Sequence, residues 1–143
     1  MVPAGISALG PHFSRLSCLQ HLDLGFNQIH AVGATALGPS LARLVCLQSL
    51  NLRGNNMMDA GAVCLGPHIA GLSSLLHLNL YTNHIYSAGA TELAPHLSSI
   101  VLLQSLILSR NHIEATGATA SGVSPHKPRL PAASWPTECL HAG

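Results

Sequence analysis

The stretch LQSLNLRGNNM, residues 47–57, decides the fold because the chain carries its pattern four times. The other copies are LQHLDLGFNQI at 19–29, LLHLNLYTNHI at 75–85 and LQSLILSRNHI at 103–113. The asparagine of the pattern recurs every 28 residues, at Asn27, Asn55, Asn83 and Asn111. A fixed period in the twenties predicts a repeat architecture, in which each unit buries its apolar side chains against its neighbours.

The first half of each unit predicts a short strand. In residues 47–57, Leu50 and Leu52 alternate with polar residues, and a period of two is typical of a strand. Strands of successive units, joined by a crossover, must lie parallel to one another. The asparagine side chain both donates and accepts hydrogen bonds. We therefore expect the four asparagines to form a buried ladder that satisfies turn backbone groups of adjacent repeats.

The second half of each unit predicts a helix. It begins at a Gly-Ala pair, such as Gly33-Ala34. The apolar residues Ala34, Leu37, Leu41 and Leu44 then follow with the spacing of one helical face. The outer layer of the repeat is therefore expected to be helical rather than extended.

Single residues predict two details of these helices. Asp59 and Ser87 lie two residues before their Gly-Ala pairs and are expected to cap the helices that follow. Prolines recur inside the helical half, at Pro39, Pro67 and Pro95. Because proline inside a helix costs about 3 kcal/mol, each helix is expected to be kinked or split there.

The period divides the chain into three parts. Residues 1–18 are interpreted as a partial N-terminal repeat that has only the helical half. Residues 19–120 contain four 28-residue repeats, of which the last is incomplete. After Thr119 the pattern fails, and residues 121–143 are rich in proline without periodicity. This segment is predicted to be an irregular or disordered tail.

The unit L-x-x-L-x-L-x-x-N-x-I followed by G-A-x-x-L resembles the ribonuclease-inhibitor-like class of leucine-rich repeats, over roughly residues 5–120. That class includes ribonuclease inhibitor, the sensor repeats of NOD-like receptors and Ran GTPase-activating protein. The resemblance implies an α/β fold, a leucine-rich-repeat solenoid forming a horseshoe segment, with parallel concave strands and convex helices. The chain has fewer strand units than members usually have and no recognisable capping repeat. We therefore expect a fragment or short isoform that could self-associate through its uncapped ends.

Composition excludes several classes of function. Only 8% of the 143 residues are charged and the formal net charge is +1, which argues against binding to nucleic acid or to acidic lipids. No apolar run approaches the roughly 20 residues that span a bilayer. The sequence has no glycine-rich phosphate loop, nucleophile elbow or C-x-x-C pair, and its five acidic residues fall in different repeat positions. The chain is therefore expected to be neither an enzyme nor a cofactor-binding protein.

The cysteines bear on the compartment. Cys18 and Cys46 share one repeat position with Ser74 and Leu102, so we interpret that position as small, apolar and buried. Neighbouring repeats would bring the two thiols to roughly 5 Å, which leaves a disulfide open as an alternative. The apolar N-terminus has no basic region typical of a signal peptide. Reduced thiols and a cytoplasmic location are therefore expected.

The ten histidines raise the question of a metal site. His84 and His112 share a repeat position and should lie about 5 Å apart, but a stable zinc site needs three or four ligands. His12, His68 and His96 each follow a repeat proline and are interpreted as exposed polar residues. No metal site is therefore predicted.

The side chains between the strand leucines are the candidates for binding a partner. They are predicted to line the concave face: His21, Asp23, Phe26, Asn51, Arg53, His77, Asn79, Tyr81 and Arg110. Aromatic residues and arginine anchor many protein interfaces, so Arg53 and Tyr81 are the expected hot spot. The sequence thus favours a non-enzymatic module that binds a protein partner of unknown identity through the concave strand face. Two alternatives stay open: a regulator that activates a small GTPase, and a non-functional truncated product of a longer leucine-rich-repeat protein.

Overall fold

Strands and helices alternate along the chain in the computed structural model, which describes residues 5, 8, 12, 13 and 15–114. The elements in chain order are β1 (His21–Asp23), α2 (His30–Leu41), β2 (Ser49–Asn51), α3 (Met58–Ile69), β3 (His77–Asn79), α4 (Ser87–Ser98) and β4 (Ser105–Ile107). Each strand begins two residues into a copy of the repeated stretch. The expected alternation of strand and helix is therefore confirmed.

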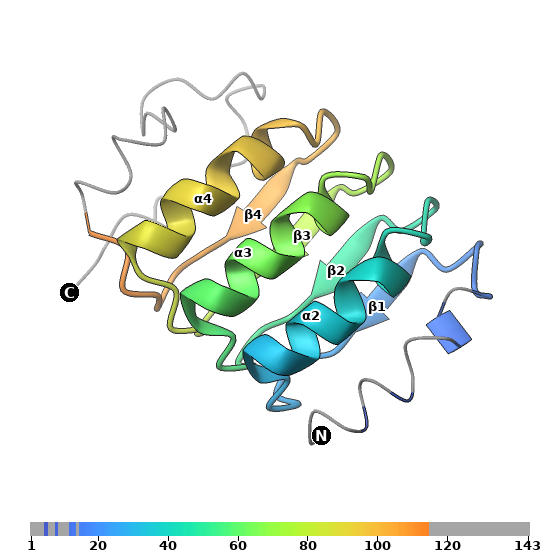
Figure 1. Cartoon of the computed structure of the whole chain (residues 1–143). Coiled ribbons are helices and arrows are strands. Elements are labelled where there is room, and N and C mark those ends of the chain that lie inside the picture. The colour runs from blue at the N-terminus through green and yellow to red at the C-terminus, as the bar shows by residue number, and fades with distance from the viewer. Residues whose placement is uncertain (1–4, 6–7, 9–11, 14, 115–143) are drawn as a thin grey trace.

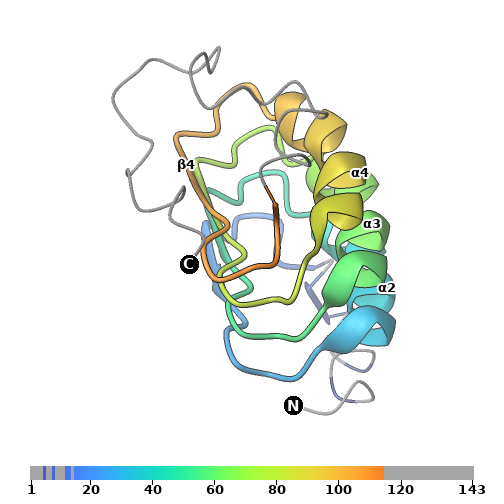
Figure 2. The ribbon, with the colours of Figure 1, turned by 90° about the vertical axis from the view of Figure 1, so that its left-hand side faces the viewer.

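The four strands form one parallel sheet in the order β1-β2-β3-β4. Equivalent leucines are paired across it: Leu22 with Leu50, Leu50 with Leu78, and Leu78 with Leu106. The three helices lie side by side along one face of the sheet (Figure 1). Seen from the side, each repeat is a coil whose strand and helix stand on opposite walls (Figure 2). The fold is the predicted α/β solenoid.

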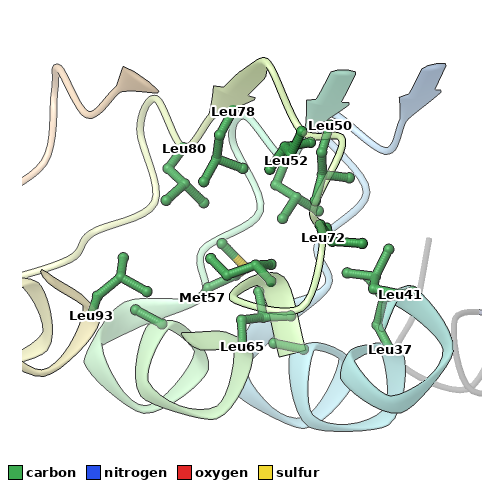
Figure 3. Close-up of a cluster of buried hydrophobic side chains, with 14 of the residues drawn as sticks. Leu37, Leu41, Leu50, Leu52, Met57, Leu65, Leu72, Leu78, Leu80 and Leu93 are labelled. Atoms are coloured by element: carbon green, nitrogen blue, oxygen red, sulfur yellow. The ribbon is translucent and has the colours of Figure 1, made fainter. Parts of the chain in front are cut away.

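The core lies between the sheet and the helices. The strand leucines point toward the helices, where Leu50, Leu52 and Leu78 meet Leu65 and Leu72 (Figure 3). Leu50 and Leu78 are each 1% exposed. Burial of one such side chain stabilises a fold by about 1.5–3 kcal/mol, so the repeated leucines supply most of the driving force for stacking.

The asparagine ladder is present. The Oδ1 atoms of Asn55, Asn83 and Asn111 each accept a hydrogen bond from the backbone amide of the asparagine one repeat earlier, at 2.9–3.1 Å. The amide nitrogen of Asn55 donates to the carbonyls of Leu24 and Leu52 at 2.8 and 2.9 Å. Both Asn55 and Asn83 are fully buried. Asn55, Asn83 and Asn111 thus each join the turn of their own repeat to the turn before it, and the two end members of the ladder, Asn27 and Asn111, are only half-buried.

The helices run unbroken through their prolines, so the expected splitting is wrong. Pro39 lies two residues before the last residue of α2, and Pro67 has the same place in α3. Proline at position 39 frees the carbonyl of Thr35, four residues earlier. Both Pro39 and Thr35 are exposed, so water can hydrate that carbonyl and the helix continues.

The predicted caps bind a different backbone group. Helix α3 begins at Met58, so Asp59 lies inside its first turn and makes no capping hydrogen bond to it. Instead, Asp59 Oδ1 accepts from the amide of Tyr86, the N-cap residue of α4, at 2.6 Å. Ser87 Oγ accepts from the amide of Glu114 in the same way, at 3.0 Å. These side chains therefore link neighbouring repeats.

The cysteine position was misread. Cys18 and Cys46 are exposed and free, and Cys64 is free as well. The repeat position shared by Cys18 and Cys46 lies in the loop between a helix and the next strand. Leu102, at the same position, is also 52% exposed. The presence of Leu102 at the same repeat position as Cys18 and Cys46 therefore did not mean that this position is buried.

Two of the histidines expected to be exposed are half-buried. The ring of His68 in α3 lies against Gly38 in α2, where a Cβ atom would overlap it. His96 in α4 packs on Gly66 in α3 in the same manner. The glycines before Pro39 and Pro67 therefore make room for the histidine of the next helix.

The tail at 121–143 and the helical half of the fourth repeat lie outside the described residues, as does most of the partial first repeat. Within the described part, no helix is long and apolar enough to cross a membrane.

Candidate functional site

The face of the sheet opposite the helices, here called the strand face, is where the predicted binding residues lie. Because side chains alternate along a strand, the leucines fill the core and their neighbours point outward. The strand face forms a groove of about 530 Å³. Its polar lining includes His21, Asp23, Ser49, Asn51, His77, Asn79 and Ser105. The structure thus brings five of the predicted residues together in one groove.

Three of these groove residues already hold backbone groups. The Oδ1 atoms of Asp23, Asn51 and Asn79 each accept a hydrogen bond from the amide two residues later, at 2.8, 3.1 and 3.0 Å. Asp23 Oδ2 also accepts from Asn51 Nδ2 at 3.0 Å. This local turn explains why short polar residues occupy the end of each of these strands. Asp23, the one acidic residue in the groove, is therefore engaged through both of its oxygens.

The remaining predicted residues lie just beyond the strands, at their carboxyl ends. There the Arg53 guanidinium carbon stands 4.9 Å from the centroid of the Phe26 ring and 4.6 Å from that of Tyr81. Phe26 comes from the preceding repeat and Tyr81 from the following one, so the guanidinium lies between the two rings. We call these three residues the arginine stack.

The backbone makes room for the stack. Phe26 and Gly54 occupy the same repeat position, and both have positive φ, 56° and 66°. A Cβ on Gly54 would lie 2.5 Å from Phe26 Cδ1. The missing side chain at position 54 therefore lets the Phe26 ring lie over the next repeat, toward Arg53. Sequence reasoning identified all three residues of the stack but not the contact of Phe26 with Arg53, because that contact joins different repeat positions.

Arg110, the last of the predicted residues, is exposed and follows β4. It occupies the same repeat position as Phe26 and has a φ of 54°. It therefore extends the row of positive-φ residues along this rim of the strand face without joining the stack.

The two histidines expected to be neighbours are in contact. His84 Nδ1 and His112 Nε2 lie 3.3 Å apart, and the rings stack with centroids 5.5 Å apart. The ring of Tyr86, a residue that the sequence analysis did not single out, also stacks on His112, with the ring centroids 4.7 Å apart. Across residues 15–114 and the few described before them, no three histidine, cysteine or acidic side chains gather as a metal site would need.

Comparison with known proteins agrees with this geometry. Residues 15–38, 44–66 and 101–120 match the model of a family described as Leucine Rich repeat. No curated protein matches the sequence. The unmatched residues 67–100 carry β3 and α4, which continue the same sheet and helical layer in the same register. The chain thus carries leucine-rich repeats at three positions, within an α/β solenoid of stacked coils.

Proposed function

We propose that this protein is a non-enzymatic interaction module of the cytoplasm that binds a protein partner through the strand face. Leucine-rich repeats typically mediate interactions between proteins, and stacked repeats present an extended surface suited to that role. The 28-residue period and the helical outer wall favour the ribonuclease-inhibitor-like class of repeat. The fold offers the strand face as a binding surface, and the side chains on that face would supply the binding chemistry.

The observation that carries this proposal is the arginine stack. Interface hot spots are enriched in tryptophan, tyrosine and arginine. Phe26 is 65% exposed, yet its ring is fixed over Gly54 and beside Arg53. Single exposed apolar side chains are common on protein surfaces and do not by themselves indicate a binding site. Here two rings and a cation from three repeats are gathered at one place beside a groove.

The proposal predicts which surface a partner touches. We would capture proteins from a cytosolic extract with the full chain, then repeat the capture with the double variant Arg53→Ala/Tyr81→Ala. The matched control is Arg43→Ala/Val32→Ala, which removes one exposed arginine and one exposed apolar side chain away from the strand face.

A hot-spot residue contributes 2 kcal/mol or more, about a 30-fold change in affinity, so the first variant should lose its specific partners. The control should retain them. A partner that binds both variants as tightly as it binds the natural chain would contradict the assignment of the strand face.

A further inference from the structure

The arginine stack leaves one part of Arg53 unused. The rings of Phe26 and Tyr81 stand on two sides of the guanidinium. Within the described residues, the Arg53 side chain donates no hydrogen bond to any protein acceptor. Its N–H groups are therefore unpaired within that part of the chain, while the two rings lie against the guanidinium.

We propose that Arg53 is a recognition site for the side-chain carboxylate of a glutamate or aspartate on the partner protein. The proposal rests on the proposed function and names the chemistry of its partner. A guanidinium presents parallel N–H groups in a rigid fork that matches the two oxygens of a carboxylate. Rings that already hold the fork in place reduce the conformational entropy lost when the carboxylate binds.

The local charges favour an acidic ligand. Asp23 is the nearest acidic residue of the strand face, and both of its oxygens are held by Gly25 and Asn51. It therefore does not compete for Arg53. Arg110, on the same rim, belongs to the repeat two further along, and no further acid among the described residues lines the groove.

The same charges favour a single negative charge over a phosphate. Phosphate sites recruit several cations, because the group carries about −1.5 to −2 charge near neutral pH. The rings that flank Arg53 are aromatic rather than basic, so one cation faces the ligand. A monoanionic carboxylate matches that arrangement in charge and in shape.

The test uses short peptides as probes and the arginine Nε–H signals of the full chain in NMR spectra. The signal of Arg53 is identified by its loss in Arg53→Lys, and the signals of Arg15 and Arg43 serve as internal references. The probes are Ac-Ala-Glu-Ala-NH2, its glutamine counterpart, Ac-Ala-Ala with a free carboxyl terminus, and inorganic phosphate.

We expect the glutamate peptide to shift the Arg53 signal saturably, with an affinity about tenfold above that of the glutamine peptide. The double variant Phe26→Leu/Tyr81→Leu should bind the glutamate peptide at least about threefold more weakly, because the fork is no longer held. Tyr86→Leu, which removes an exposed ring elsewhere, should leave the affinity unchanged.

Three outcomes would overturn the inference: a response of Arg53 no larger than that of Arg43, equal binding of the glutamate and glutamine peptides, or tighter binding of phosphate or of the free carboxyl terminus. These are separable from failure of the proposed function. Partner capture that depends on the stack, without selectivity for the glutamate peptide, would leave the interaction face standing and remove the carboxylate. If the chain selects the glutamate peptide but captures its partners equally well after the Arg53→Ala/Tyr81→Ala change, Arg53 binds a carboxylate and the strand face is not the surface that holds the captured partners.

Discussion

Replacement of Asn55 by alanine tests the ladder on which the fold depends. Asn55 is 0% exposed. Its Oδ1 accepts from the amides of Asn27 and Ile29 at 2.9 and 3.4 Å, and its Nδ2 donates to the carbonyls of Leu24 and Leu52. Alanine removes all of these hydrogen bonds at once, and it leaves their backbone partners in place.

The cost follows from which partners are left unpaired. The Leu52 carbonyl keeps a second hydrogen bond, from Asn83 Nδ2 at 2.9 Å. The Leu24 carbonyl and the amides of Asn27 and Ile29 lose their partner in the ladder, the Ile29 bond being the longest of the three at 3.4 Å. A buried polar group without a partner costs about 1–3 kcal/mol, so the two shorter of these bonds alone predict a loss of roughly 2–6 kcal/mol in the free energy of unfolding.

Asn27→Ala is the matched control, because it removes the same amide from the first rung of the ladder. The Asn27 side chain makes one hydrogen bond, from Nδ2 to the Gly25 carbonyl at 3.0 Å. Gly25 is half-exposed, so water can replace the donor. The expected loss is only about 0.5–1.5 kcal/mol.

Urea unfolding of the full chain, followed by far-ultraviolet circular dichroism, distinguishes the two changes. With a slope of about 2 kcal/mol per molar urea, Asn55→Ala should lower the midpoint by roughly 1–3 M, and Asn27→Ala by well under half as much. Parallel slopes would show that both variants unfold from the same folded state. If Asn55→Ala proves no more costly than Asn27→Ala, the ladder does not hold the repeats together as argued.

Three further predictions concern contacts between repeats, and the same urea titration measures each. Gly38→Ala should destabilise the natural chain, but in a His68→Ala background it should stabilise by about 0.5–1 kcal/mol, because the overlap is gone and alanine favours a helix. Gly54→Ala should cost more beside the Phe26 ring than in a Phe26→Ala background, where only the left-handed backbone cost of about 1–2 kcal/mol remains. Asp59→Ala should cost about 0.5–2 kcal/mol and Asp59→Asn less, since asparagine keeps the acceptor. For each pair of variants, an equal change in the free energy of unfolding would show that the contact between the two repeats does not contribute as argued.

The sheet and the ladder could be predicted from the sequence because each repeat imposes the same constraint. Asn27, Asn55 and Asn83 occupy one position of the pattern, and no other residue replaces them. A residue that recurs in register must meet its own copy 28 residues away, so periodicity alone places the contact. The hydrogen bonds from one asparagine to the next are that contact.

Features that link different positions of the pattern could not be predicted in this way. Arg53 and Tyr81 share a position, but Phe26 belongs to the position after it, so nothing in the period pairs its ring with the guanidinium. The capping prediction failed for a similar reason. A local rule assigns Asp59 to its own helix, and the acceptor is used 27 residues later, at Tyr86.

The hydrogen bonds that hold the described repeats together do not involve the side chains of the arginine stack. The amides of Arg53 and Tyr81 are fixed by Asn51 and Asn79, through hydrogen bonds that do not involve the side chains at positions 53 and 81. The backbone under the stack is therefore set by the strand-end asparagines and by the buried ladder. Loss of the Arg53 side chain removes its contacts with the two rings but no hydrogen bond of the described fold. A change of binding after substitution at position 53 consequently reports on recognition, whereas the same change after substitution at Asn51 would also report on a displaced turn.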